Sequence, residues 1–199
     1  GVQTCALPIS DRATLVYPRV SERGWQLFAE SLTDETTKPR ALTEFNSEMP
    51  SEWRFSRDGK QLAVVESRDT VVVGPIAEWK RAERLPFPNI AASLSWSPDG
   101  RFLACQEKQQ LYLLTREDSD SDRYVSDFQM VSESCASRVW GWRGMQLIFG
   151  DAKTDATNLY TIDAESHSQP AQIVQARAWG SAPREISLSP DGNQMACLV

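Results

Sequence analysis

The sequence predicts an all-β protein, and three observations support this prediction. First, WSPDGRFLAC (Trp96 to Cys105) joins an aromatic residue, a tight turn and a short apolar run, the pattern of two strands connected by a hairpin. Second, the pattern recurs as FSRDGKQLAV from Phe55 and LSPDGNQMAC from Leu188. Third, the apolar runs follow one another at steps of 47, 41, 44 and 48 residues, aligned on Leu15, Leu62, Leu103, Leu147 and Met195. A period in the forties with several strands per unit is typical of β-propeller blades.

Residue chemistry explains the turn. Pro98 sets φ to about −65° at the second turn position. Asp99 can form hydrogen bonds with nearby backbone through its short side chain, and Gly100 allows a positive φ. The other copies carry similar residue types at the same places. We therefore assign a structural role, and no catalytic one, to the turn residues Ser56, Asp58, Gly59, Ser97, Pro98, Asp99, Gly100, Ser189, Pro190, Asp191 and Gly192.

A fourth copy of the turn is degenerate. WGWRGMQLIF (Trp140 to Phe149) keeps an aromatic residue, a glycine and an apolar run, but it has lost Ser, Pro and Asp. This alignment matches Trp140 with Trp96, and it adds Gly144 to the structural turn residues. We expect Gly144 to tolerate substitution better than Gly100 if this turn has changed type.

The rest of each repeat predicts further strands. A second apolar run begins at Gln26, Thr70, Gln110 and Asn158, and a third, shorter run begins at Arg40, Ala82, Arg123 and Ala171. Counting the strand that leads into the turn, each repeat is one four-stranded antiparallel blade. The predicted blade units are residues 11–45 (partial), 46–88, 89–130, 131–178 and 179–199 (partial). An all-β sandwich is the alternative, but a shared motif at one fixed point of the period favours the propeller.

The repeats resemble a known family. WSPDGRFLA and its copies resemble the WD-like propeller repeat of the TolB family, and KPRALTEF (Lys38 to Phe45) resembles that family's blade junction. LVYPRVSERGWQLFAESL (Leu15 to Leu32) follows the family's strand–loop–strand pattern. The resemblance covers about residues 11–199. The turn around Trp142 and the strand VVVGPIAEWK (Val71 to Lys80) depart from the family pattern.

The resemblance implies a function without naming a ligand. It implies a non-catalytic scaffold that binds a protein or peptide partner in the bacterial periplasm or cell envelope. Similar blades occur in the propeller domains of prolyl-oligopeptidase-like serine peptidases, where they gate substrate entry, and in the sensor domains of membrane-bound winged-helix transcriptional regulators. The first alternative predicts a G-x-S-x-G elbow beyond Val199. The second predicts a winged helix and an apolar span before Asp11, so both alternatives stay open.

The two ends of the sequence differ from the repeats. GVQTCALPI (Gly1 to Ile9) matches no blade and resembles translated sequencing-adapter DNA, so we predict that residues 1–10 are a non-native leader. Residues 11–199 then begin where the first blade's turn is expected, and they end inside the strand QMACLV. We therefore expect an incomplete β-propeller of about four blades from a ring of six to eight.

Residue patterns for catalysis or metal binding are sparse. The sequence has no G-x-S-x-G elbow, no phosphate-binding P-loop and no dinucleotide fingerprint. Glu117 to Asp122 carries alternating carboxylates like a calcium loop. Counted from Asp118, however, the sixth and twelfth positions hold Arg123 and Gln129 in place of the required Gly and Glu. His167 is the only histidine and cannot form a metal site alone. We predict no cofactor, no metal and no enzymatic activity for this chain.

Composition and charge limit the classes of partner that we expect this chain to bind. The formal net charge is −6 and the basic residues are scattered, which argues against a nucleic-acid surface on this chain. No apolar run approaches the length of a membrane span. Cys105 and Cys197 occupy the same place in two blades and are expected to be buried, whereas Cys135 is expected near a surface. No disulfide framework is predicted.

Four of the seven tryptophans fall into two groups. Trp53 and Trp96 lie on strands that enter the turn, where we expect them to pack between blades. Trp79 and Trp179 lie nearer the expected rim, and they are candidate partner contacts because tryptophan is enriched at interface hot spots.

Overall fold

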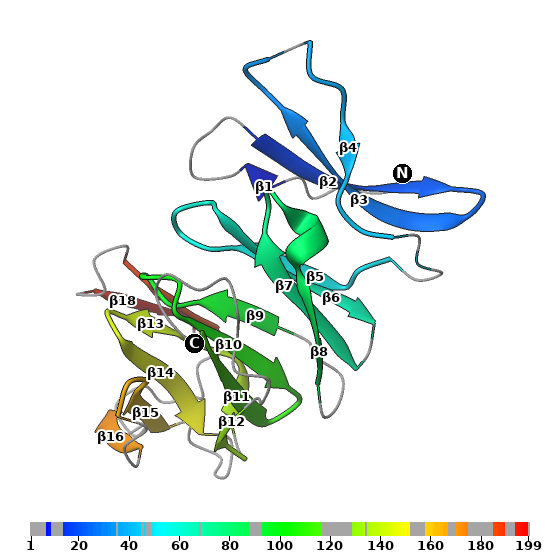
Figure 1. Cartoon of the computed structure of the whole chain (residues 1–199). Coiled ribbons are helices and arrows are strands. Elements are labelled where there is room, and N and C mark those ends of the chain that lie inside the picture. The colour runs from blue at the N-terminus through cyan, green and yellow to red at the C-terminus, as the bar shows by residue number, and fades with distance from the viewer. Residues whose placement is uncertain are drawn as a thin grey trace. The chain divides into compact units, whose positions relative to one another are not determined.

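The computed structural model describes most of the chain, and its described part forms two compact units, Gly1–Ile90 (the N-terminal unit) and Ala91–Val199 (the C-terminal unit). Figure 1 shows the strands of both units, which are treated separately below. The described residues are 7–8, 14–34, 36–44, 46, 49–67, 69–87, 93–116, 129–133, 135–151, 158–166, 170–174, 185–189 and 194–198.

The N-terminal unit contains two four-stranded antiparallel sheets. The first has the order β1 (Leu7–Pro8), β2 (Thr14–Ser21), β3 (Gly24–Ser31) and β4 (Arg40–Ala41). The second has the order β5 (Glu52–Phe55), β6 (Gln61–Ser67), β7 (Thr70–Pro75) and β8 (Glu83–Pro86), with a short 3-10 helix η1 (Trp79–Arg81) between β7 and β8. One hydrophobic cluster joins the two sheets, and its buried members are Val16, Leu27, Ala29, Leu42, Trp53, Leu62, Val64 and Ile76.

The C-terminal unit contains two further four-stranded sheets and one strand pair. One sheet consists of β9 (Ser93–Trp96), β10 (Phe102–Glu107), β11 (Gln110–Thr115) and β12 (Gln129–Ser132). The next consists of β13 (Cys135–Arg143), β14 (Gln146–Asp151), β15 (Asn158–Asp163) and β16 (Ala171–Val174). The pair is β17 (Glu185–Leu188) and β18 (Met195–Leu198), and β17 contacts β13. The all-β class and the four-stranded antiparallel blade are therefore confirmed.

The strand register reproduces the period of the sequence. Each residue used to align the repeats lies on the second strand of its sheet, opposite the last residue of the first strand or, for Leu147, the last but one. These pairs are Leu15 with Pro8, Leu62 with Phe55, Leu103 with Trp96, Leu147 with Trp142, and Met195 with Leu188. The repeat in the sequence is thus a repeat in backbone pairing.

Two predicted segments need comment. Leu7–Pro8, inside the predicted leader, forms β1 and takes the place that the strand before the turn holds in the other sheets. The non-native origin of residues 1–10 stays a prediction. The third run of the 89–130 unit, predicted from Arg123, lies outside the described residues, and the outer strand described there is β12, which begins at Gln129.

The turns that contain Ser56 and Ser97 have the same pattern of hydrogen bonds. In one sheet, Ser56 Oγ donates to Asp58 Oδ1 (2.6 Å) and accepts from Gln61 N–H (2.9 Å), while Lys60 N–H donates to Asp58 Oδ1 (3.0 Å). The bonds of Ser97 and Asp99 are equivalent, with lengths of 2.6, 2.9 and 3.1 Å. Gly59 and Gly100 have φ of 72° and 73°. In the β17–β18 turn, Ser189 Oγ accepts from Gln194 N–H, and Pro190 to Gly192 lie outside the described residues.

We expect these turns to make the stability of the protein sensitive to acid. Burial raises the pKa of Asp58 and Asp99, but the hydrogen bonds from Ser56 and Ser97 and from backbone N–H groups outweigh burial, so both pKa values lie below the usual one. A lowered pKa in the folded state stabilises the protein above the unfolded pKa of about 3.9. That contribution is lost as pH falls through the lower folded pKa.

We expect the urea concentration at the midpoint of unfolding to decrease when the pH is lowered from about 6 to about 3. The double variant Asp58→Asn, Asp99→Asn should lose less over the same interval, because neither position can then take up a proton. Equal acid sensitivity in both proteins would contradict the assignment.

The degenerate turn has a different register from the one predicted. Trp142, and not Trp140, pairs with Leu147 and so matches Trp96. Only Gly144 and Met145 separate the pair Arg143 and Gln146, so this hairpin is two residues shorter than the others. Gly144 has φ of 55° at the first central position, as a two-residue type II′ turn requires. The alignment on Trp140 was wrong because it kept the loop length constant.

Two further predictions concern buried side chains. Trp53 packs in the cluster that joins the two N-terminal sheets, which confirms its place between blades, and Trp96 is buried on β9. Cys105 is buried, as predicted. The surface position predicted for Cys135 is wrong: it is fully buried at the start of β13, in the same cluster as Phe102 and Trp142. A polar sequence neighbourhood did not reveal that β13 begins at this residue.

Candidate partner-binding groove

A groove of about 760 Å³ lies in the N-terminal unit, between the outer strand β4 of one sheet and the β7–β8 connection of the other. We call it the Trp79 groove. Its lining residues are Arg40, Ala41, Leu42, Glu44, Val72, Ala77, Glu78, Trp79, Lys80, Arg81, Ala82 and Arg84.

The β7–β8 connection forms one wall of the Trp79 groove. The chain leaves β7 at Pro75, and the next residue, Ile76, is buried in the cluster between the sheets while its N–H donates to Lys60 O (2.9 Å). One 3-10 turn follows, in which Arg81 N–H donates to Glu78 O (2.8 Å) and Ala82 N–H to Trp79 O (2.9 Å). The wall is therefore a hydrogen-bonded turn, and Ile76, at its start, anchors it to the core.

Trp79 lies at the junction of this wall and the core. Its side chain is half-buried, packs against the cluster between the sheets, and also lines the groove. A large aromatic side chain held by the core on one side leaves its remaining surface available for a partner. Trp79 was predicted as a partner contact from its place in the sequence. The second such residue, Trp179, lies outside the described residues.

Gly74 allows the wall to lie close to β7. A Cβ added at Gly74 would come within 2.5 Å of Ala82 Cα and 2.6 Å of Ala82 Cβ, distances that real Cβ atoms do not tolerate. The obstacle includes backbone, so the turn itself must move.

We expect Gly74→Ala to lower the free energy of unfolding by about 1–3 kcal/mol through overpacking. Urea unfolding followed by circular dichroism measures this change. Gly144→Ala is a comparison without crowding: nothing lies within 4 Å of a Cβ added there, so its loss reflects only the backbone strain of alanine at φ of 55°. An unchanged unfolding midpoint for Gly74→Ala would contradict the close packing of Ala82 on β7.

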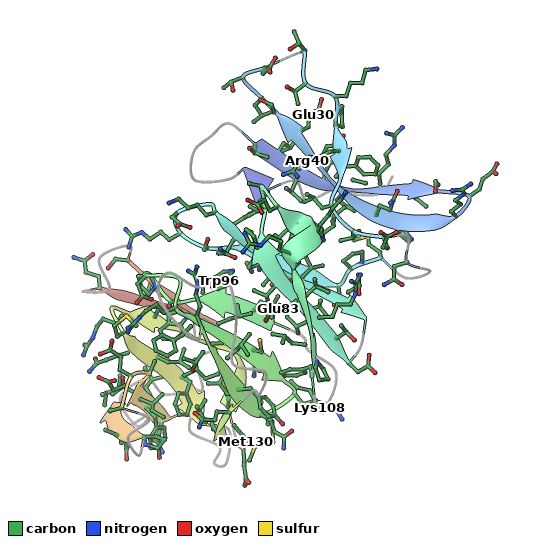
Figure 2. The ribbon with its side chains drawn as sticks, viewed as in Figure 1. Glu30, Arg40, Glu83, Trp96, Lys108 and Met130 are labelled. Carbon is green, nitrogen blue, oxygen red and sulfur yellow. The ribbon has the colours of Figure 1, made fainter. Side chains whose placement is uncertain are left out.

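Arg40 holds the two walls of the groove together. It lies on β4, opposite Ala29 of β3. The Arg40 side chain is labelled in Figure 2. Its guanidinium donates to two carbonyl groups at the start of the other wall, Ile76 O through Nη2 and Ala77 O through Nη1 (3.3 Å). Neither acceptor is a carboxylate, so the positive charge of Arg40 is fixed in place without being neutralised by these bonds.

The other cations of the groove differ in their pairing. Arg81 forms an ion pair with Glu78 (3.1 Å), and Arg84 binds Glu66 of β6 through two hydrogen bonds of 3.0 and 3.1 Å. The hydrogen bond and the charge of Glu66 raise the pKa of Arg84. Lys80 is exposed and forms no ion pair within the part of the chain that the structure describes.

Sequence reasoning located only part of this site. It singled out Trp79 and marked VVVGPIAEWK as a departure from the family pattern, and that departure is the segment that forms the wall. It missed Arg40 and Arg84. Arg40 lines the groove only because β4 of one sheet packs beside the β7–β8 connection of the other. The turn residues of the blades are not among the lining residues of the groove.

The structure adds little about metal or membrane binding. Among the residues it describes, no group of three or more His, Cys, Asp and Glu side chains could hold a metal ion, and no helix is long and apolar enough to cross a bilayer. The acidic stretch from Glu117 to Asp122 and His167 lie outside the described residues.

Comparisons with known proteins identify the fold. No protein-family model matches the chain, and no curated protein sequence matches it. Among solved structures, the Cps50 (Swd1) β-propeller domain of Myceliophteria thermophila matches with a TM-score of 0.68 and 16% identity, over 99% of this chain and 63% of that one. TolB from Acinetobacter baumannii matches with a TM-score of 0.51 and 12% identity, over 88% and 44%. A chain of the mitotic checkpoint complex matches with a TM-score of 0.57 and 17% identity, over 92% and 54%.

These identities are low enough that the matches establish the fold alone. The chain spans 63% of the length of the Swd1 propeller domain and smaller shares of the other two. Four four-stranded antiparallel sheets in sequence order, together with these matches, show that the chain has the β-propeller fold.

Proposed function

We propose that this chain is a non-catalytic β-propeller scaffold that binds a protein or peptide partner, and that the Trp79 groove receives a segment of that partner. One observation carries the proposal: Trp79 is fixed against the core on one side and borders a groove of about 760 Å³ on the other. An anchored aromatic side chain loses little conformational entropy when a partner packs on it.

The walls of the groove also support this use. Arg40 and the bonded turn at η1 hold the groove in shape, so binding needs little reorganisation. The accessible apolar lining comes from Trp79, Ala41, Ala77 and Ala82 and suits apolar side chains of a peptide, and the charged rim suits its polar groups.

We extend the proposal to a TolB-like protein of the bacterial cell envelope. Its support is the resemblance of the WSPDG-type turns and the match in fold to TolB. Fractionation of the source cells with an antibody against this chain tests the location, and recovery in the cytoplasmic fraction would overturn it.

A peptide selection tests the binding function. The chain is immobilised and used to enrich binders from a random displayed peptide library, and the affinities of the enriched peptides are measured for Trp79→Ala and for the control Trp25→Ala. Trp25 is half-buried in the same unit but does not line the groove. We expect Trp79→Ala to weaken binding by about thirtyfold, as loss of a hot-spot side chain does, and Trp25→Ala to leave binding unchanged.

Two further measurements complete this test. Circular dichroism establishes that both variants are folded, and Trp79→Phe should restore part of the affinity because it restores an aromatic face. The proposal is overturned if no peptide is enriched, or if the folded Trp79→Ala protein binds the enriched peptides as tightly as the unaltered chain.

A further inference from the structure

We infer that the segment received by the Trp79 groove is an acidic peptide, whose carboxylates are bound by Arg40 and Lys80. This inference rests on the proposed function and specifies its partner. The groove is lined by four cations and two carboxylates, although the whole chain has a formal net charge of −6. The groove is therefore a local exception to the charge of the chain.

Pairing within the site determines which cations remain for a partner. Arg81 is paired with Glu78, and Arg84 donates from Nε and Nη2 to the two carboxylate oxygens of Glu66. The remaining carboxylate of the lining, Glu44, interacts electrostatically with Arg84. Arg40 and Lys80 are the two lining cations for which the described residues supply no carboxylate.

Arg40 is suited to bind a carboxylate. A guanidinium has five N–H donors in a fixed planar arrangement, and the carbonyls of Ile76 and Ala77 take donors from Nη2 and Nη1 only. These bonds fix its orientation from the groove wall, so a partner's carboxylate meets an oriented donor and not a freely rotating one. The Lys80 ammonium adds a second, flexible charge on the opposite wall.

The lining favours a peptide over a nucleic acid. Nucleic-acid surfaces carry many cations in sequence along the phosphate backbone. Here Arg40 and Lys80 line the groove together with Glu44 and Glu78 and with the partly exposed apolar residues Trp79 and Ala82. A peptide that alternates acidic and apolar side chains matches both the charge and the apolar surface, whereas a continuous phosphate chain meets carboxylates at the rim.

Fluorescence anisotropy with defined peptides tests this inference. The probes are a short labelled peptide rich in glutamate and leucine, the same peptide with every glutamate replaced by glutamine, and a labelled oligothymidylate. We expect the glutamate peptide to bind most tightly and its affinity to fall with added salt. Lys80→Glu should weaken this binding by about tenfold, as charge reversal at an exposed site does.

Arg57→Glu is the matched control. Arg57 is an exposed residue of the same unit, does not line the groove, and its reversal changes the net charge by the same amount. We expect it to leave the affinity within about twofold. Equal losses in Lys80→Glu and Arg57→Glu would mean that only the overall charge acts, and would overturn the inference.

The test separates this inference from the proposed function. If the selected peptides depend on Trp79 but carry no excess of acidic residues, and the glutamine peptide binds as well as the glutamate peptide, the scaffold function stands and the acidic partner is wrong. Tighter, Lys80-dependent binding of oligothymidylate would overturn the peptide assignment. If no probe or selected peptide binds at all, both proposals fail.

Discussion

Trp142→Ala is expected to lower the free energy of unfolding by about 3–5 kcal/mol, as truncation of a buried aromatic side chain does. Trp142 is 9% exposed, stacks on Phe102 with a ring-centroid distance of 6.4 Å, and donates from Nε1 to Ser95 O (3.3 Å). The substitution removes the apolar area, the ring contact and the hydrogen bond together. Urea unfolding followed by far-ultraviolet circular dichroism measures the loss.

Trp142→Phe is the control for this prediction. It keeps an aromatic ring against Phe102 but removes the indole N–H and leaves a smaller cavity, so its loss should be well below that of Trp142→Ala. A loss below about 1 kcal/mol for Trp142→Ala would contradict the position of this side chain in the core. It would also favour the alignment in which Trp142 belongs to the turn.

Gly100→Val is expected to lower the free energy of unfolding by about 1–3 kcal/mol. Gly100 has φ of 73°, a region that a β-branched residue enters only with strain. It is also buried, and its N–H donates to Ser97 O (3.0 Å) to close the turn. A valine therefore strains the backbone and crowds its neighbours, and the loss is measured by the same urea unfolding.

Two variants separate backbone strain from crowding in this second prediction. Gly100→Asn should lose less than Gly100→Val, because asparagine enters the left-handed region more readily. Gly144→Val should also lose less, since Gly144 has φ of 55° but is exposed, with nothing within 4 Å of an added Cβ. Equal and negligible losses for Gly100→Val and Gly144→Val would contradict the turn assignment.

The candidate site lies where the sequence of one blade differs from that of the others. Three turns keep similar Ser, Asp and Gly residues, whereas VVVGPIAEWK (Val71 to Lys80), the segment that departs from the resembled pattern, leads into the groove wall. Residues that maintain a repeat are constrained by pairing. A connection that leaves the sheet is free to carry a site specific to one protein.

The β13–β14 hairpin shows that the sequence repeat locates a blade but does not determine the length of its turn. The period located this blade correctly, because Leu147 occupies the same pairing position as Leu62 and Leu103. The matching aromatic residue was misplaced by two positions, because a hairpin can shorten by two residues without turning its side chains to the other face. Only the pairing of Arg143 with Gln146 shows that the turn was shortened.

The sequence by itself determined the class, the four-stranded blade and the chemistry of the turns, because alternating apolar runs and the Ser-x-Asp-Gly motif act over a few neighbouring residues. Only the tertiary structure decided that Cys135 is buried and that Arg40, Trp79 and Lys80 line one groove. These facts depend on packing between segments distant in the sequence. Arg40 reaches carbonyls 36 and 37 residues away, a contact that no local pattern encodes.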